Sequence, residues 1–161
     1  MDFEIIHFRD AEKILEEKSM VSDVNITCEY LFDELVGTKY RRDILRDALD
    51  AMGWREKHVE LNILPGRRYS YKGVKGEFAI DGNFSSYEYL HTGLLRLQLG
   101  YDKGTIESGI LLLPSNRSDK SPYGNTSDML EDEMQMLFPT ISLPVSICLF
   151  DLGEPFIPED N

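Results

Sequence analysis

The sequence lacks the features of membrane, secreted and disulfide-stapled proteins. No apolar run approaches the roughly 18 residues of a membrane-spanning helix. The acidic start, Met1-Asp-Phe-Glu, has none of the basic and then apolar order of a signal peptide. The two cysteines, Cys28 and Cys148, are too few for a disulfide framework. We therefore expect a reduced, cytoplasmic protein with no membrane partner.

Positive charge is also scarce. The 17 Lys and Arg residues stand against 29 Asp and Glu residues, so the net charge is −12 with neutral histidines. A strongly negative surface repels phosphate, which argues against a protein that coats nucleic acid without preference. The charge does not exclude DNA contact through a local basic patch. It equally suits an acidic face that docks on a basic protein partner.

Several catalytic signatures are absent as well. His7, His58 and His91 are scattered, and no HExxH or CxxC spacing occurs, which excludes a zinc site carried by a local motif. The sequence contains no GxxxxGKS/T phosphate loop and no GxGxxG dinucleotide turn. It contains no GxSxG turn either, so a serine nucleophile elbow is excluded.

What is present is the composition of a globular protein. The chain has 161 residues, of which 42% are hydrophobic, and this is enough to bury a core without disulfides or a structural metal. We expect a single domain over residues 1–152, followed by an acidic, proline-containing tail at 153–161.

Apolar periodicity predicts an alternation of helices and strands. The helices are expected at 10–18, 40–52, 87–101 and 127–137, and the strands at 58–64, 69–74, 77–84, 110–113 and 144–152. Asp10 is expected to cap the first helix, and Ser85 with Glu88 fits a capping box. Residues 19–38 fit either a strand or a helix, and residues 115–126 read as a long loop. The order indicates an α/β fold with a mixed sheet packed between helices.

One carboxylate lies where a sheet protein could hold a metal. If Phe78 and Ile80 point into the core, Asp81 and Asn83 share the opposite face of the same strand. A carboxylate and an amide two residues apart offer two oxygens of the kind that Mg²⁺ prefers, and Glu60 from a neighbouring strand would complete the site. The alternative is that Asp81 and Gly82 simply form a turn, because Asp-Gly is a common turn pair.

Basic residues are unevenly placed. One group lies on or just before the second predicted helix, and another lies in the meander with tyrosines between its members. The stretch 67–76 of the meander contains no acidic residue. Arg and Lys with interleaved aromatics suit a phosphate backbone, although a solvated hairpin would have the same composition. The two groups are Lys39, Arg41, Arg42 and Arg46, and then Arg67, Arg68, Lys72 and Lys75.

Four segments give the chain a family resemblance over residues 40–152. They are GWREKHVE at 53–60, NFSSYEY at 83–89, IESGILLLPSN at 106–116 and LPVSICLF at 143–150. In their apolar strands and spacing these segments resemble the BglII/BstYI-type restriction endonucleases. The resemblance implies the PD-(D/E)XK nuclease fold, a restriction-endonuclease-like mixed β-sheet flanked by helices. It also implies a homodimer acting on double-stranded DNA, and a place in DNA transactions or in defence against foreign DNA.

The resemblance also assigns the residues of the active site. Family members carry Glu-x-Gln-Phe on a strand, and Asp81-Gly82-Asn83-Phe84 stands at that position here. In the family an Asp precedes the Glu by about nine residues, and the two carboxylates hold Mg²⁺ for phosphodiester hydrolysis. Lys72 lies nine residues before Asp81, where that second carboxylate is expected. A lysine repels a cation and removes a ligand.

Two interpretations follow for function. In the first, the protein is a diverged Mg²⁺-dependent endodeoxyribonuclease. Asp81, with Glu60 or Glu77, then binds the metal, and Asn83 orients the attacking water. The phosphates contact the basic residues of the meander: Arg67, Arg68, Lys72 and Lys75. In the second, the motif is degenerate and the fold is a pseudoenzyme kept for binding, either to DNA or to a protein partner through its acidic surface.

Overall fold

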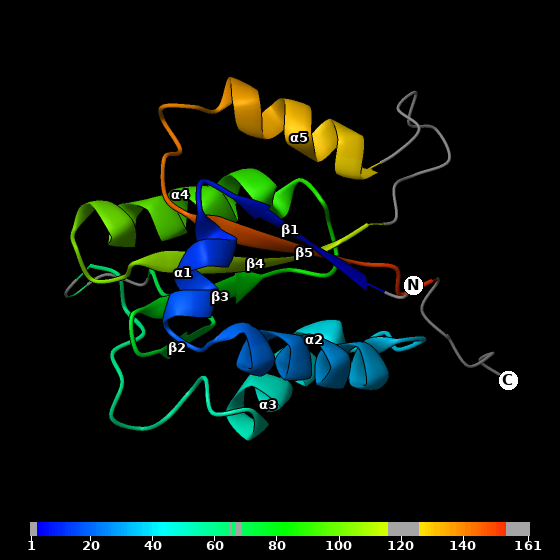
Figure 1. The fold of residues 1–161 in the computed structure, drawn as a ribbon. Coiled ribbons are helices and arrows are strands. Elements are labelled where there is room, and N and C mark those ends of the chain that lie inside the picture. The colour runs from blue at the N-terminus through cyan, green and yellow to red at the C-terminus, as the bar shows by residue number, and fades with distance from the viewer. Residues whose placement is uncertain (1–2, 65, 67–68, 116–125, 154–161) are drawn as a thin grey trace, which may run out of the picture.

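The computed structural model describes residues 3–64, 66, 69–115 and 126–153. Its elements alternate along the chain as Figure 1 shows. The strands are β1 (Phe3–Phe8), β2 (Gly73–Lys75), β3 (Phe78–Gly82), β4 (Ser108–Pro114) and β5 (Val145–Phe150). The helices are α1 (Ala11–Glu17), α2 (Val21–Leu35), α3 (Arg41–Ala51), α4 (Tyr89–Asp102) and α5 (Thr126–Met136). None of the described helices is long and apolar enough to cross a membrane.

The strands form one five-stranded mixed sheet in the order β1-β5-β4-β3-β2. β3, β4 and β5 run parallel at its centre, and β1 and β2 pair antiparallel at the two edges. Helices α1, α2 and α3 pack on one face, and α4 and α5 on the other (Figure 1). The predicted α/β class and mixed sheet are confirmed.

Burial on both faces explains the sequences of the central strands. Every residue of β4 and of β5 is buried, which is why these strands read as continuous apolar runs. In β3 the side chains alternate between two cores. Phe78 and Ile80 pack with α2 and α3, whereas Ala79 packs with α4. The face that carries Asp81 is therefore buried under α4 rather than open to solvent.

Several local expectations are corrected. Residues 19–38 contain helix α2, and β1 is an edge strand that periodicity did not predict. The expected strand at 58–64 is wrong, because this stretch contributes only an isolated bridge between Asn62 and Ser70. Asp10 stands at the N-cap of α1 in a left-handed conformation (φ 67°) and makes no capping hydrogen bond with its side chain. The N-cap of α4 is Glu88, so Ser85 does not cap that helix.

The end of β3 and the start of β2 lie side by side. The Lys72 amide donates to the Ile80 carbonyl at 3.0 Å, and the Asn83 amide donates to the Leu112 carbonyl at 3.0 Å. Gly82 permits the second approach, since a Cβ at that position would lie 2.6 Å from the Cβ of Leu112. Lys72 and Asn83 are therefore held at the same end of the sheet, beside Asp81.

Candidate functional site

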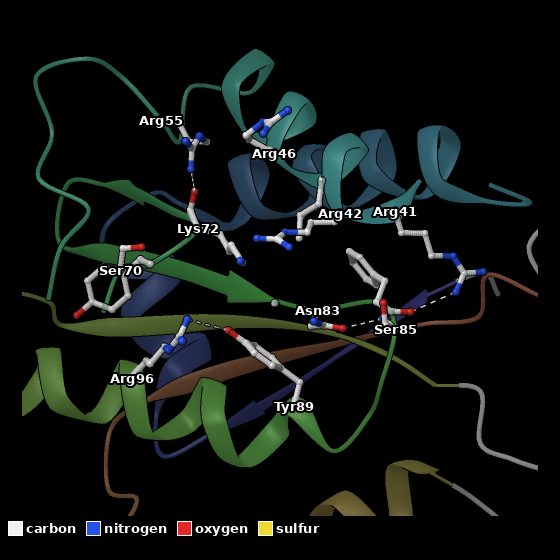
Figure 2. A pocket seen from close by; sticks show the side chains of 14 residues that line it. Arg41, Arg42, Arg46, Arg55, Ser70, Lys72, Asn83, Ser85, Tyr89 and Arg96 are labelled. Carbon is white, nitrogen blue, oxygen red and sulfur yellow. Dashed lines mark hydrogen bonds between the residues drawn. The ribbon is translucent and has the colours of Figure 1, made fainter. Parts of the chain in front are cut away.

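A cleft of about 520 Å³ opens at this end of the sheet, between α3 and α4. The segment before β2 and the segment after β3 complete its walls (Figure 2). None of the described residues that line it has an acidic side chain. The lining includes six cationic side chains, namely Arg41, Arg42, Arg46, Arg55, Lys72 and Arg96. In a chain of net charge −12, this is a concentrated positive site.

Helix geometry places the cations that come from α3 and α4. Arg42 and Arg46 are four residues apart, so they project from one side of α3, while its apolar residues Ala48 and Leu49 are buried against the core. Tyr89 and Arg96 are two turns apart on α4, so their side chains lie on the same face of the helix. Arg96 Nη1 donates to the Tyr89 hydroxyl at 3.3 Å. Each helix thus buries its apolar side and presents its basic side to the cleft.

Asp81 is completely buried and lies just beneath the cleft. Its carboxylate accepts the Gly82 amide at 2.9 Å, and both of its oxygens lie 3.0 Å from the hydroxyl of Tyr89, a residue that lines the cleft. Burial raises the pKa of Asp81 to about 6, against the opposing effects of these hydrogen bonds and of the charges of Arg96 and Lys72. Burial, followed by the Asp81 charge, also raises the pKa of Tyr89.

Asn83 lines the cleft directly. Its Oδ1 accepts the backbone amide of Ser85 at 2.7 Å, so this oxygen is already engaged by the chain. The amide nitrogen points away from Ser85 (Figure 2). Asn83 therefore offers the cleft a hydrogen-bond donor rather than the oxygen that a metal ion would require.

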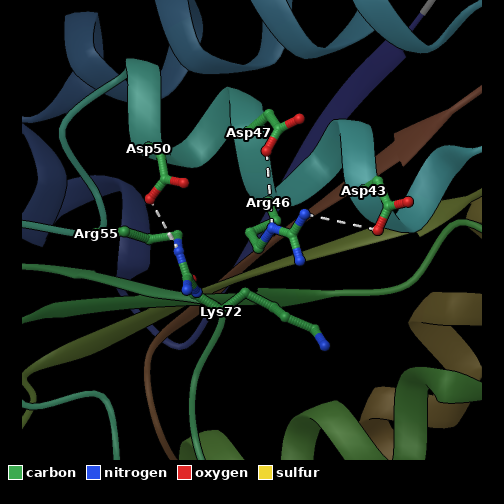
Figure 3. Close-up of polar contacts among 6 residues, drawn as sticks. All are labelled: Asp43, Arg46, Asp47, Asp50, Arg55 and Lys72. Atoms are coloured by element: carbon green, nitrogen blue, oxygen red, sulfur yellow. Dashed lines mark hydrogen bonds and ion pairs between the residues drawn. The ribbon is translucent and has the colours of Figure 1, made fainter.

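Three of the six cations are already occupied by other groups. Arg46 forms ion pairs of 3.7 Å with Asp43 and with Asp47 (Figure 3). Arg55 donates to the Asp50 carboxylate at 3.0 Å (Figure 3) and to the Lys72 carbonyl at 2.9 Å (Figure 2). The guanidinium of Arg41 donates to three backbone carbonyls, those of Thr38, Phe84 and Gly153.

The other three, which we term the inner cations, are Arg42, Lys72 and Arg96. Neither the Arg42 guanidinium nor the Lys72 ammonium forms a hydrogen bond or an ion pair with any residue that the structure describes. Among the described residues, the Arg96 guanidinium hydrogen-bonds to a neutral hydroxyl, that of Tyr89, and to no carboxylate. Figure 2 shows all three directed into the space between α3 and α4. Their charge is available to a ligand.

The structure brings only some of the predicted site residues together. Lys72 and Asn83 line the cleft, and Asp81 lies beneath it. Glu60 is exposed outside the cleft lining, where its Oε1 accepts the Asn62 amide at 2.8 Å. Arg67 and Arg68 lie outside the described residues.

Lys75 is also absent from the cleft lining. Its ammonium donates to the Met52 carbonyl at 2.9 Å, contacts Asp23 at 3.4 Å and lies 5.1 Å from the centre of the Trp54 ring. These contacts use its charge to hold α2, α3 and the β2–β3 hairpin together. DNA contact by Lys75 stays a prediction.

Sequence reasoning missed Tyr89 and Arg96 as site residues, and it recognised Arg42 only as one of a basic group. The spacing of Tyr89 and Arg96 did carry a signal. They are seven residues apart on a helix that follows the Asp81 strand, which puts them on one face toward that strand. Arg42 could be assigned to the site only from the tertiary structure, because α3 and α4 pack on opposite faces of the sheet and both contribute to the cleft lining.

The donor set does not fit a magnesium site. Within the described part of the chain, no group of three or more His, Cys, Asp or Glu residues could hold a metal ion. Asp81 supplies one carboxylate, whose two oxygens already accept the hydroxyl of Tyr89. The charges of Lys72 and Arg96 act on the same carboxylate and would repel a divalent cation.

The mixed sheet with helices on both faces, and the cleft at the end of its central strands, agree with a restriction-endonuclease-like fold. The family model described as "Restriction endonuclease BglII/BglIII" matches residues 3–148, and the chain belongs to this family. The predicted family is thereby confirmed.

Several solved structures resemble the chain, and two of them are structures of BglII. The crystal structure of restriction endonuclease BglII complexed with a DNA 16-mer superposes with a TM-score of 0.62 at 13% identity, over 95% of this chain and 78% of that one. The crystal structure of free BglII gives a TM-score of 0.57 at 15% identity, over 93% and 79%. At these identities the likeness shows the shared fold. Comparison with the curated proteins finds no match.

Proposed function

We propose that the protein binds double-stranded DNA in this cleft, as a restriction-endonuclease-like reader of the phosphodiester backbone without metal-dependent cleavage. One observation carries the proposal: among the described residues, the cleft is lined by six cations and no acid, in a protein of charge −12. The family supports DNA as the ligand, because the similar BglII structure is a complex with a DNA 16-mer. Arg and Lys in a concave site suit phosphate oxygens.

The donor set supports the non-catalytic part of the proposal. Hydrolysis assisted by Mg²⁺ needs acidic oxygen ligands that hold the ion against the scissile phosphate. Here Asp81 is buried under Tyr89, and Lys72 stands where the family resemblance expects the second carboxylate. Glu60, the alternative ligand, is outside the cleft lining and bonded to Asn62. The arrangement favours holding a phosphate over cutting its ester bond.

Fluorescence anisotropy with a labelled DNA duplex at low and moderate salt tests binding. Substitution Arg42→Gln should weaken binding about tenfold, because a hydrogen bond to a charged group contributes about 1.5 kcal/mol or more. Lys13→Gln on α1 is the matched control. It removes the same charge from a side chain that is 73% exposed and far from the cleft lining, and it should leave affinity unchanged.

Cleavage is tested separately by incubating supercoiled plasmid with the protein and Mg²⁺ or Mn²⁺. Intact plasmid together with salt-sensitive binding supports the proposal, and metal-dependent nicking would refute its non-catalytic part. If the protein neither binds nor cuts DNA, the acidic protein-interaction module becomes the better interpretation. The homodimer implied by the family stays a prediction, which sedimentation of the free and DNA-bound protein would check.

A further inference from the structure

We infer that the ammonium of Lys72 stands in the place of a divalent cation beside Asp81, so that the inner end of the cleft is a metal-independent oxyanion site. The ligand is a phosphate group, either a phosphodiester of DNA or a free phosphate, held by Arg42, Lys72 and Arg96. Where the phosphate belongs to DNA, the inference rests on the proposed function. It goes further by naming the Lys72 ammonium as the group that neutralises the phosphate charge.

The first support is position. The backbone of Lys72 is tied to the end of β3 by the 3.0 Å hydrogen bond from its amide to the Ile80 carbonyl. The carbonyl of Lys72 is held from the other side by Arg55 at 2.9 Å (Figure 2). The residue is thus fixed at both backbone groups, next to the strand that carries Asp81. Burial raises the pKa of Asp81, and the Lys72 charge is the smallest of the effects that lower it, which agrees with an ammonium near the carboxylate but not in contact with it.

The second support is the state of the ammonium. Other cations of this region have partners: Arg46 contacts two aspartates, Arg55 contacts Asp50, and Lys75 contacts Asp23. Lys72 is half-buried in a cleft whose lining includes no acid, and it contacts no carboxylate at ion-pair distance among the described residues. A half-buried ammonium that has no carboxylate partner favours an anionic ligand.

The third support is the chemistry of the surrounding groups. The Asn83 oxygen is engaged by Ser85, which leaves its amide nitrogen as a donor. The guanidinium groups of Arg42 and Arg96 cannot accept hydrogen bonds at all. The site therefore presents donors from α3, from the residue before β2, from the residue after β3 and from α4. Convergent donors with positive charge are suited to an oxyanion and reject a metal ion.

The experiment compares DNA affinity in EDTA with affinity in Ca²⁺, for the parent, Lys72→Gln and Lys72→Asp. The parent should bind a labelled duplex equally well in both buffers. Lys72→Gln should bind about tenfold more weakly in both, because a charged donor is lost. Lys72→Asp should bind still more weakly in EDTA and regain affinity in Ca²⁺, since it places a second carboxylate near Asp81. Circular dichroism and thermal melts verify that each variant is folded.

Three results would overturn the inference. The first is parent binding that requires Ca²⁺, and the second is unchanged affinity in Lys72→Gln. The third is a failure of Ca²⁺ to restore Lys72→Asp, because the ammonium would then not occupy a position from which a metal can act.

A second arm separates the inference from the proposed function. Inorganic phosphate is titrated in EDTA while Tm is measured, without DNA. If phosphate raises Tm of the parent and not of Lys72→Gln, but no duplex binds, the oxyanion site stands, its source is free phosphate, and the DNA-binding proposal fails. If neither phosphate nor DNA binds, both are refuted.

Discussion

Substitution Asp81→Asn should stabilise the protein at neutral pH and not at acidic pH. Burial raises the pKa of Asp81 from its ordinary value of 3.8 to about 6, so the folded protein disfavours the ionised carboxylate. At 1.36 kcal/mol per pH unit, this difference costs the folded state about 3 kcal/mol once the group is ionised in both states. The cost is absent below pH 3.8, grows as the pH rises, and is complete above about 6.

The hydrogen bonds of the site tolerate the change. The Oδ1 of an asparagine can still accept from the Gly82 amide, and its NH₂ can donate to the Tyr89 hydroxyl in place of the present bond. Asp81→Asn should therefore raise the free energy of unfolding by the cost that ionisation of Asp81 imposes on the folded parent. The variant also loses the attraction between the Asp81 carboxylate and the charges of Lys72 and Arg96. The pKa of about 6 already includes this attraction, so the value of about 3 kcal/mol is the net effect.

Urea unfolding of the parent and of Asp81→Asn between pH 4 and pH 8 measures the effect. We expect nearly equal free energies of unfolding at pH 4, and a gain in the variant of as much as about 3 kcal/mol at pH 8. Asp132→Asn on the exposed side of α5 is the control and should change stability by less than about 0.5 kcal/mol at either pH. A variant that is destabilised equally across the range would refute the reasoning, since Asp81 would then be stabilising as an anion.

Two further predictions follow from the same region. DNA binding should strengthen as the pH falls through about 6, because protonation of Asp81 removes the negative charge beside Lys72 and Arg96; anisotropy titrations should show this step in the parent and lose it in Asp81→Asn. Gly82→Ala should cost about 1–3 kcal/mol or more in unfolding free energy, because the new Cβ would lie 2.6 Å from the Leu112 Cβ. A Gly82→Ala variant that melts like the parent would contradict this account of the β3–β4 approach.

Sequence reasoning succeeded where structure depends on local pattern. The apolar spacing of α3 and the continuous apolar runs of β4 and β5 correspond to burial on one face and on two faces. It failed for β1, because an edge strand beside the chain's start is recognisable only by its pairing with β5, far along the sequence. It also failed at 58–64. Apolar and polar residues alternate there, but the segment pairs with another segment only at one bridge, between Asn62 and Ser70.

The site shows the same division. The position of Asp81 and Asn83 at the end of a strand was readable, and so was the lysine at position 72 where a carboxylate was expected. The sequence did not show which partner each charged side chain contacts. Lys75 resembles Lys72 in sequence, yet its ammonium is tied to Met52 and Asp23, whereas that of Lys72 projects into the cleft.

By itself, the sequence determined the α/β class, the family and the replacement of a ligand by Lys72, because periodicity and motif spacing are properties of the chain. Only the tertiary structure decided that the cleft is positive. Its inner cations come from α3, from the segment before β2 and from α4, and they meet because the sheet order and the helix faces bring these segments together. A net charge of −12 describes the whole surface, but binding depends on the field inside a concave site.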